Sequence, residues 1–371
     1  MKSFSIIDKL SENSDHLPQV FEILKKDQLP IVMFGAGALG RYFLEIFQTA
    51  GVRIDHVVAN RIYWRENLML EDKPVEILEE ILQRYDQVNV FCALQYLQPI
   101  KKLESQLIDS CRVKHFFTYD TGCIHYGYRD LTIDFVRQCE QDFEWIYNEL
   151  ADELSRSTLL AYLNQRISGR VGYLERVLDR DHLFPKDLIA LNDEEVFVDC
   201  GAFDGKTIQD FVVALRAQGR SLNQPIYALE PDAMNREMIH RNCANLTSLT
   251  IIPRGAWNEN GFLSFAHGGG ATSRLLESGT GNISVDRIDN LLKDKKITYL
   301  KLDVEGAELN ALKGAAQCIS QFKPKIGVCV YHRSIDLVTI PKFIKNIVPE
   351  YKLYLRAHSI GANDLLLYCL I

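Results

Sequence analysis

The sequence predicts an α/β protein with two doubly wound domains joined by helices. The chain has 371 residues, more than one hydrophobic core usually serves, so two domains are expected. Each half contains a strand-like apolar run that leads into a glycine-rich turn and then a helix. These runs are residues 31–34 before Gly35 and residues 196–199 before Gly201. This succession is typical of a parallel sheet that binds a ligand beyond its strand ends.

The first domain is expected to cover residues 1–130, as a small Rossmann-like fold around a GxGxxG motif. Its expected elements follow from apolar periodicity: helix 14–27, strand 31–34, helix 41–49, and strands 54–59, 88–93 and 115–118. The glycines of the motif are Gly35, Gly37 and Gly40, and Asn60 stands where dinucleotide-binding domains place a ribose-binding acid. Two interpretations remain open, a structural module and a second nucleotide or nucleotide-sugar site formed by these four residues.

Residues 131–189 are expected to form a helical bridge between the domains. Apolar side chains recur there every three or four residues, at Phe135, Cys139, Phe143, Ile146, Leu150 and Leu154. This spacing predicts one amphipathic helix. A second helix is expected from about Thr158 to Gly169, because glycine commonly follows the last helical residue.

The second domain is expected to cover residues 190–371 and to alternate strands with helices. The predicted strands are 196–199, 226–229, 249–254, 261–266, 297–303, 325–331, 352–356 and 365–370. The predicted helices are 207–218, 232–243, 284–293, 307–320 and 341–348. The alternation favours a parallel sheet, and the last two adjacent strands favour an antiparallel end.

Composition and charge limit the partners of the chain. A formal charge of −7 argues against general nucleic-acid binding, which needs a basic face. The nine cysteines never form a CxxC pair, so they are expected to be reduced thiols. No run of 18 apolar residues and no apolar signal core occurs, which predicts a cytoplasmic protein without membrane insertion. A homo-oligomer is compatible with the sequence.

The glycine-rich turn of the second domain predicts a nucleoside-binding site. Gly201 and Gly205 allow the backbone to turn sharply and approach a ligand, and the helix that follows offers unpaired N–H groups. Glu230 ends the next strand, 25 residues beyond Gly205, where an acid receives ribose hydroxyls. These residues alone allow any adenosine cofactor.

Three acids lie at a later strand-to-helix junction, Asp303, Glu305 and Glu308. Asp303 and Glu305 are expected beyond the carboxyl end of their strand, where ligands bind. Glu308 suits the first turn of the following helix, where an acid complements the helix dipole. Lys301 is expected either to pair with Asp303 or Glu305 or to act in catalysis.

Four segments in order resemble the FkbM family of S-adenosylmethionine-dependent methyltransferases. They are VFVDCGAFDGKT, YALEPD, LKLDVEGAELNALKGA and the tail from VYHRSIDL to YLRAHS, within residues 190–371. The resemblance implies a seven-stranded class I methyltransferase fold and methylation of a hydroxyl on a sugar, glycan precursor or natural product. The acceptor would then be a small molecule or glycan, in polysaccharide biosynthesis for example. The domain at residues 1–130 resembles those of nucleotide-sugar enzymes.

The resemblance also implies which residues bind S-adenosyl-L-methionine. The loop around the methionine part of the cofactor would comprise Asp199, Gly201, Ala202, Phe203, Gly205 and Thr207. Glu230 would bind the ribose, with Pro231 and Asp232 beside it. Ala256 and Trp257 would line the adenine, and Asp303 would lie near the reactive methyl.

Methyl transfer to an alcohol favours a general base, and His332 is the leading candidate because it ends a predicted strand and titrates near neutral pH. Asp303, Glu305 and His358 are the alternatives. Metal-free chemistry is expected, although Asp303 could instead bind a divalent ion. Residues 267–274 could form a lid or acceptor loop, or only the end of a hairpin. His358 could contact an anionic acceptor or fill a polar edge.

Two other function classes remain open. One is an oxidoreductase that uses nicotinamide or a nucleotide sugar at the first GxGxxG motif. The other is a non-catalytic binding protein that retains the fold.

Overall fold

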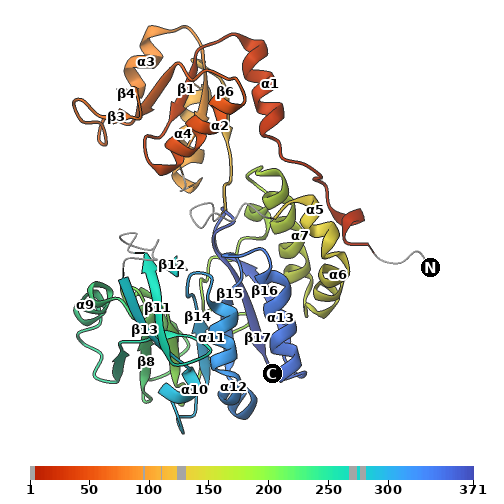
Figure 1. The fold of residues 1–371 in the computed structure, drawn as a ribbon, viewed down its shortest axis with the longest axis vertical. Coiled ribbons are helices and arrows are strands. Elements are labelled where there is room, and N and C mark those ends of the chain that lie inside the picture. Colours follow the sequence, from red (N-terminus) through yellow and green to blue (C-terminus); the bar gives the residue numbers. More distant parts are fainter. Residues whose placement is uncertain (1–4, 95–96, 110, 123–130, 267–273, 276–280) are drawn as a thin grey trace.

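The computed structural model describes residues 5–94, 97–109, 111–122, 131–266, 274–275 and 281–371. Two sheets occupy opposite ends of the molecule, and the helices of residues 133–168 lie beside the C-terminal one (Figure 1). The predicted fold class, two doubly wound domains joined by helices, is confirmed. No helix within these ranges is long and apolar enough to span a membrane.

The N-terminal sheet has six strands in the order β3-β4-β2-β1-β5-β6. Their bounds are β1 Ile31–Phe34, β2 His56–Ala59, β3 Met69–Leu70, β4 Lys73–Ile77, β5 Val88–Cys92 and β6 Val113–Thr118. All neighbours pair in parallel except β3 and β4. The helices are α1 Leu17–Asp27, α2 Ala38–Thr49, α3 Leu78–Arg84 and α4 Leu97–Asp109, after a short 3-10 turn at Ile7–Lys9. The sequence analysis did not predict β3, β4, α3 or α4. Strand β3 has two residues, β4 has five and α3 has seven, and such short elements carry too few periods to stand out.

Apolar side chains on both faces of this sheet hold the first domain together. Strand β1 is buried along its whole length, as expected for a central parallel strand. On one face Phe43 and Phe47 of α2 pack edge-on against Phe91 of β5, with ring centroids 4.7 and 4.9 Å apart. The GxGxxG turn therefore lies between a rigid strand and a rigid helix.

The C-terminal sheet has seven strands in the order β16-β17-β15-β14-β7-β8-β9. Their bounds are β7 Phe197–Cys200, β8 Ile226–Leu229, β9 Leu249–Ile252, β14 Tyr299–Leu302, β15 Lys325–Cys329, β16 Lys352–Ala357 and β17 Leu365–Leu370. Only β17 runs antiparallel to its neighbours. The helices are α8 Lys206–Ala217, α9 Ala233–Asn242, α11 Glu308–Gly314, α12 Ala316–Phe322 and α13 Asp336–Ile347. The predicted antiparallel end is confirmed, and the carboxyl ends of β14, β7 and β8 lie side by side.

Three predicted helices differ from the structure. The helix expected at 307–320 is divided into α11 and α12, and the one expected at 341–348 begins earlier, with Pro341 inside α13. The prediction of a helix at 284–293 is wrong for residues 284–286. They belong to β13 Gly281–Asp286, which pairs antiparallel with β11 Gly261–Ala266, and only α10 Ile288–Leu291 is helical. Pairing with a distant strand overrides local propensity there.

The strand predicted at 261–266 is present, but it belongs to a separate small sheet. That sheet has the order β10-β13-β11-β12, with β10 at Gly255–Ala256 and β12 at Arg274–Leu275. Strand β10 pairs in parallel with β13. The chain forms this small sheet between the end of β9 and the start of α10.

The prediction of a single amphipathic helix from Phe135 to Leu154 is wrong, because the helix is interrupted twice there. It forms α5 Ile133–Gln138, α6 Glu140–Glu149 and α7 Glu153–Ser168. At the second break Leu150 is extended and bridges to Leu353 of β16, while Asp152 caps α7 by accepting from Ser155 N at 2.7 Å. The predicted end of α7 at Gly169 is confirmed, with φ 73°.

A buried arginine joins α7 to the edge of the seven-stranded sheet. Arg356 of β16 is 1% exposed. Its Nη2 donates to Asp152 Oδ2 at 2.7 Å and to Asp187 Oδ2 at 3.1 Å, and its Nη1 donates to Ser155 Oγ at 2.9 Å. The helices of residues 133–168 are thus fixed to the sheet by charge as well as by apolar packing.

We expect Arg356→Ala to lower the free energy of unfolding by about 2–5 kcal/mol, because it leaves a cavity where the buried arginine packed and removes the cation from Asp152 and Asp179, which are 33% and 14% exposed. Urea unfolding of the full chain measures this. The matched control is Arg137→Ala, because the Arg137–Asp134 pair is exposed and should contribute less than about 1 kcal/mol. Equal losses in the two variants would contradict the structural role of Arg356.

Polar contacts also tie the first domain to the rest of the chain. Asp120, just after β6, accepts from Gln165 Nε2 at 2.5 Å and from the backbone N of Ala362 at 2.7 Å. Ile360, in the loop between β16 and β17, is buried within an apolar cluster of the first domain that includes Phe34 and Val90. One loop of the C-terminal sheet therefore lies in the N-terminal core.

Candidate functional site

The turn after β7 leaves no space for side chains at its first glycine. Gly201 has φ 77°, and a Cβ there would lie 1.9 Å from the carbonyl oxygen of Asp303. Gly205 has φ 83° and precedes the first residue of α8, where a Cβ would lie 2.8 Å from Cys243 Sγ. Phe203 also has positive φ, 48°. The turn is thus shaped by backbone conformations that favour glycine, as the sequence predicted.

Asp199 of β7 forms a buried ion pair with Lys301. Its side chain is 0% exposed, and its Oδ1 lies 2.9 Å from Lys301 Nζ. Lys301 also donates to the carbonyl oxygen of Gly201 at 2.9 Å. The carboxylate of Asp199 keeps the pKa of Lys301 above its ordinary value although burial acts in the opposite direction. Asp199 thus supports the turn through Lys301, and its contact with the cofactor stays a prediction.

Glu230 follows β8 and closes the turn from the other side. Its Oε2 accepts from the backbone N of Phe203 at 3.0 Å, and its Oε1 accepts from Asp232 N at 2.9 Å and Asn235 Nδ2 at 3.2 Å. A carboxylate offers about four lone-pair directions, so Oε2 keeps capacity for a hydroxyl donor. Burial raises the pKa of Glu230 above its ordinary value, although these donors lower it.

The other predicted cofactor residues lie around these two strand ends. Ala202 is buried in the turn, and Thr207 is the second residue of α8. Asp232 caps α9, because its Oδ1 accepts from Met234 N at 2.8 Å and Asn235 N at 3.0 Å. A Cβ on Gly255 would lie 3.7 Å from Pro231 Cγ. The segment with Ala256 and Trp257 therefore begins beside Pro231.

The junction after β14 approaches the same turn. The backbone N of Asp303 donates to the carbonyl of Cys200 at 3.1 Å. Glu305 adopts a left-handed conformation with φ 58°, followed by Gly306 with φ 91°. A non-glycine residue there costs about 1–3 kcal/mol, and such strain often accompanies function. The junction turns sharply enough to direct both acids toward the end of β15.

His332, shortly after β15, is surrounded by these acids. Its Nε2 lies 3.2 Å from Glu305 Oε2 and 3.6 Å from Asp303 Oδ1, and its Nδ1 lies 2.9 Å from Glu308 Oε1. The imidazole is 1% exposed, whereas Glu305 and Asp303 are 28% and 34% exposed. The structure thus brings together the three residues predicted to be catalytic.

The charges of this cluster are strongly coupled. Burial alone would lower the pKa of His332, but Glu308, Glu305 and Asp303 outweigh burial and hold it well above its ordinary value. Burial alone would raise the pKa of Asp303, but Lys301 and His332 bring it below its ordinary value. Burial, with Glu308 as the next cause, raises the pKa of Asp336 to about 7. The acids around His332 therefore favour the protonated form of its imidazole.

The sequence analysis assigned Glu308 only to the start of a helix and did not single out Asp336. Glu308 does serve the start of α11, since its Oε1 accepts from Val304 N at 2.9 Å, but the same oxygen also contacts His332. Asp336 is 2% exposed in the first turn of α13. Its only sequence signal was an acid among apolar residues four positions after His332.

His358 does not belong to this cluster of acids. Its Nδ1 lies 3.0 Å from the carbonyl of Asp179, and its Nε2 lies 2.8 Å from Tyr368 Oη. These contacts support the polar-edge interpretation. Of the loop predicted at 267–274, all but Arg274 lies outside the described residues.

In the first domain the GxGxxG turn is closely packed at two of its three glycines. A Cβ would lie 2.6 Å from the Ala93 carbonyl at Gly35 and 2.3 Å from the Gly35 carbonyl at Gly40. A Cβ on Gly37 would meet nothing within 4 Å. The carbonyl of Asn60 accepts from Tyr63 N and Trp64 N. These packing roles account for Gly35 and Gly40, and a nucleotide site stays a hypothesis.

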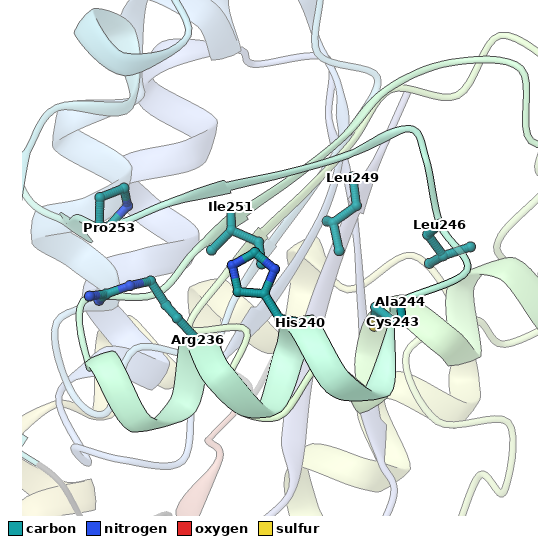
Figure 2. A pocket seen from close by; sticks show the side chains of 8 residues that line it. All are labelled: Arg236, His240, Cys243, Ala244, Leu246, Leu249, Ile251 and Pro253. Atoms are coloured by element: carbon teal, nitrogen blue, oxygen red, sulfur yellow. The ribbon is translucent and has the colours of Figure 1, made fainter.

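Figure 2 shows a cavity of about 380 Å³ between α9 and β9. It is lined by Arg236, His240, Cys243, Ala244, Leu246, Leu249, Ile251 and Pro253. This set shares no residue with the predicted cofactor site. The eight cysteines that the structure describes, Cys243 among them, are free, as predicted.

Three comparisons relate the chain to known proteins. Residues 199–356 match the family model described as a methyltransferase FkbM domain. The crystal structure of methyltransferase FkbM from Methylobacillus flagellatus is 23% identical with a TM-score of 0.74, and the match covers 95% of this chain and 93% of that one. No curated protein sequence matches the chain significantly.

Two further solved structures match only part of the chain. Fibrillarin from Aeropyrum pernix, in complex with S-adenosyl-L-methionine, is 13% identical with a TM-score of 0.33, covering 50% of this chain and 71% of that one. An rRNA methylase from Streptococcus thermophilus is 12% identical with a TM-score of 0.32, covering 48% and 87%. Scores at this level carry no argument. The match to the methyltransferase FkbM domain model is confined to residues 199–356, which lie in the C-terminal part of the chain.

Proposed function

We propose that the chain is a cytoplasmic methyltransferase that transfers a methyl group from S-adenosyl-L-methionine to a hydroxyl of a sugar, glycan precursor or similar small molecule. One observation carries this proposal. The glycine turn after β7, Glu230 after β8 and Asp303 after β14 follow three neighbouring parallel strands. Ligands of open α/β sheets bind beyond the carboxyl ends of such strands.

Each part of the cofactor has a matching group around this turn. The backbone at Gly201 and Gly205, with the start of α8, suits the methionine carboxylate. The open lone pair on Glu230 Oε2 suits a ribose hydroxyl. The segment with Ala256 and Trp257 begins beside Pro231 and would line the adenine. Asp303 would then face the sulfonium, whose positive charge its carboxylate attracts.

When bound, the cofactor supplies an electrophilic methyl group. The protein's part is to align the acceptor hydroxyl with that methyl and to remove its proton. Asp303, Glu305 and His332 lie together where this proton would leave. The charges of Asp303 and His332 shift each other's pKa, so we assign the base function to the cluster as a unit. Its partly exposed members, Asp303 and Glu305, are open to the acceptor.

Isothermal titration calorimetry with S-adenosylmethionine and S-adenosylhomocysteine tests the cofactor. We expect 1:1 binding of both, and binding of neither would overturn the proposal. Incubation with isotope-labelled cofactor and glycan or nucleotide-sugar extracts tests the acceptor. A hydroxyl product heavier by one labelled methyl supports this acceptor class, whereas label confined to RNA or protein would exclude it.

The affinity for S-adenosylhomocysteine should fall as the pH is lowered toward the pKa of Glu230. That pKa lies above its ordinary value in the free protein. Ribose hydroxyls donate to the ionised carboxylate, so the pKa of Glu230 is lower in the complex than in the free protein. Between these two pKa values a proton on Glu230 competes with the ligand. Calorimetry from pH 5 to pH 8 measures this dependence, which Glu230→Gln should flatten. An unchanged pH profile in Glu230→Gln would refute the ribose contact.

A further inference from the structure

We propose that Asp303, Glu305 and His332 bind a divalent first-row transition-metal ion. The ion would lie between the junction after β14 and the end of β15. Binding of the ion follows from the protein's own side chains, and only its use in holding the acceptor rests on the proposed function. With the ion bound, the three side chains act as its ligands in place of the base role assigned above.

The spacing of the three side chains fits one ion. One ligand atom from each of Asp303, Glu305 and His332 lies within 4.8 Å of the other two, and His332 Nε2 is 3.2 Å from Glu305 Oε2 and 3.6 Å from Asp303 Oδ1. Nitrogen and oxygen ligands lie about 2.0–2.2 Å from such ions. Two neighbouring ligands on one ion are therefore about 3–4 Å apart. Small rotations of two partly exposed carboxylates would complete the site.

The second observation is the orientation of the imidazole. Metal-binding histidines typically present one nitrogen to the ion and hydrogen-bond the other to a carboxylate. Here Glu308 Oε1 lies 2.9 Å from His332 Nδ1, and both side chains are buried, with 0% and 1% exposed. Glu308 is held in turn, because the same oxygen accepts from Val304 N. Nε2 is thereby aimed at Glu305 and Asp303.

The third observation is the balance of charge. Asp303, Glu305 and Glu308 contact His332, and Asp336 interacts with Glu308 and His332 through its charge. When Lys301 is included, which lies 2.9 Å from Asp199 and 4.0 Å from Asp303, four carboxylates face two buried basic side chains. The carboxylates are those of Asp199, Asp303, Glu305 and Glu308, and the basic side chains are those of Lys301 and His332. An unbalanced buried negative charge is costly. A divalent ion would offset this excess of carboxylates.

The ligand types indicate the class of metal and its use. Two carboxylates and one imidazole suit Mn²⁺, Fe²⁺ or Zn²⁺, whereas Ca²⁺ and Mg²⁺ favour all-oxygen sites. Three protein ligands leave coordination positions open on the exposed side. Two adjacent positions suit two neighbouring hydroxyl oxygens, so the proposal favours an acceptor with a vicinal diol, as in a sugar.

Titration of the metal-free full chain with Mn²⁺ alone tests the site, with free Mn²⁺ followed by electron paramagnetic resonance. We expect one saturable ion per chain and at least about tenfold weaker binding in Glu305→Gln and Asp303→Asn. Glu308→Gln should weaken binding about 10–100-fold by releasing His332. The matched control is Glu350→Gln, because Glu350 is exposed and pairs only with Lys323 among the contacts described, so its affinity should equal that of the wild type.

Three outcomes would overturn the proposal: no saturable binding at millimolar Mn²⁺, wild-type affinity in both Glu305→Gln and Asp303→Asn, or equal weakening in Glu350→Gln. Circular dichroism of each variant establishes that it is folded. S-adenosylhomocysteine titrated in the presence of EDTA separates the two proposals. Binding of S-adenosylhomocysteine without binding of Mn²⁺ leaves the proposed function standing and removes the metal, whereas binding of Mn²⁺ alone does the reverse.

Discussion

Gly201→Ala should weaken S-adenosylhomocysteine binding by about 100-fold or more. The new Cβ would lie 1.9 Å from the carbonyl oxygen of Asp303. That oxygen belongs to the backbone and cannot rotate away, so the turn and the junction after β14 must separate. A displacement of about 1 Å in a binding site can cost a factor of 10². Calorimetry on the full chain measures the loss.

Gly219→Ala is the matched control for this substitution. Gly219 has a similar positive φ, 69°, but a Cβ there would meet nothing within 4 Å. Both variants carry the backbone strain of about 1–3 kcal/mol, and only Gly201→Ala adds the clash. We expect wild-type affinity in Gly219→Ala. Wild-type affinity in a folded Gly201→Ala would show that the turn does not bind the cofactor.

Glu305→Gln should lower the rate of methyl transfer by about 100-fold or more while leaving the affinity for S-adenosylhomocysteine within about threefold. Glu305 Oε2 lies 3.2 Å from His332 Nε2 and is 28% exposed, so it can reach both the cluster and an acceptor. General base catalysis typically contributes about 10²–10⁴-fold. Glutamine keeps the size of the side chain and removes its charge.

Transfer of a labelled methyl group to the acceptor extract measures this rate, and calorimetry measures the affinity in parallel. Glu350→Gln is again the control, and both of its values should match the wild type. Equal loss of rate and affinity in Glu305→Gln would place Glu305 in cofactor binding instead. An unchanged rate would exclude it from the acceptor site.

Several fold features could be predicted because their signals are local. Short apolar runs bounded by turn residues predicted the strands that precede Gly201, Glu230 and Asp303. Gly169 predicted the end of a helix, because glycine commonly follows the last helical residue. The predictions failed where a distant partner decides the conformation. Leu150 leaves the helix to bridge Leu353, and residues 284–286 pair with β11 rather than starting a helix.

For the candidate site, too, the residues that follow strand ends could be predicted and the contacts between distant residues could not. The sequence predicted Asp303, Glu305 and His332 individually, because each follows the end of a strand. It could not predict that Glu308 contacts His332 Nδ1 or that Lys301 pairs with Asp199. Those contacts depend on which strands are neighbours, and apolar periodicity does not contain that information.

The sequence by itself determined the order of strands and helices, the glycine turns and the acids at strand ends, since burial and turn geometry act over a few residues. Only the tertiary structure decided that the turn after β7 touches the backbone of Asp303 and that three carboxylates contact His332. The pairing of β14 with both β7 and β15 brings these groups together. Charges that are remote in the chain then share one buried environment, and that environment sets their chemistry.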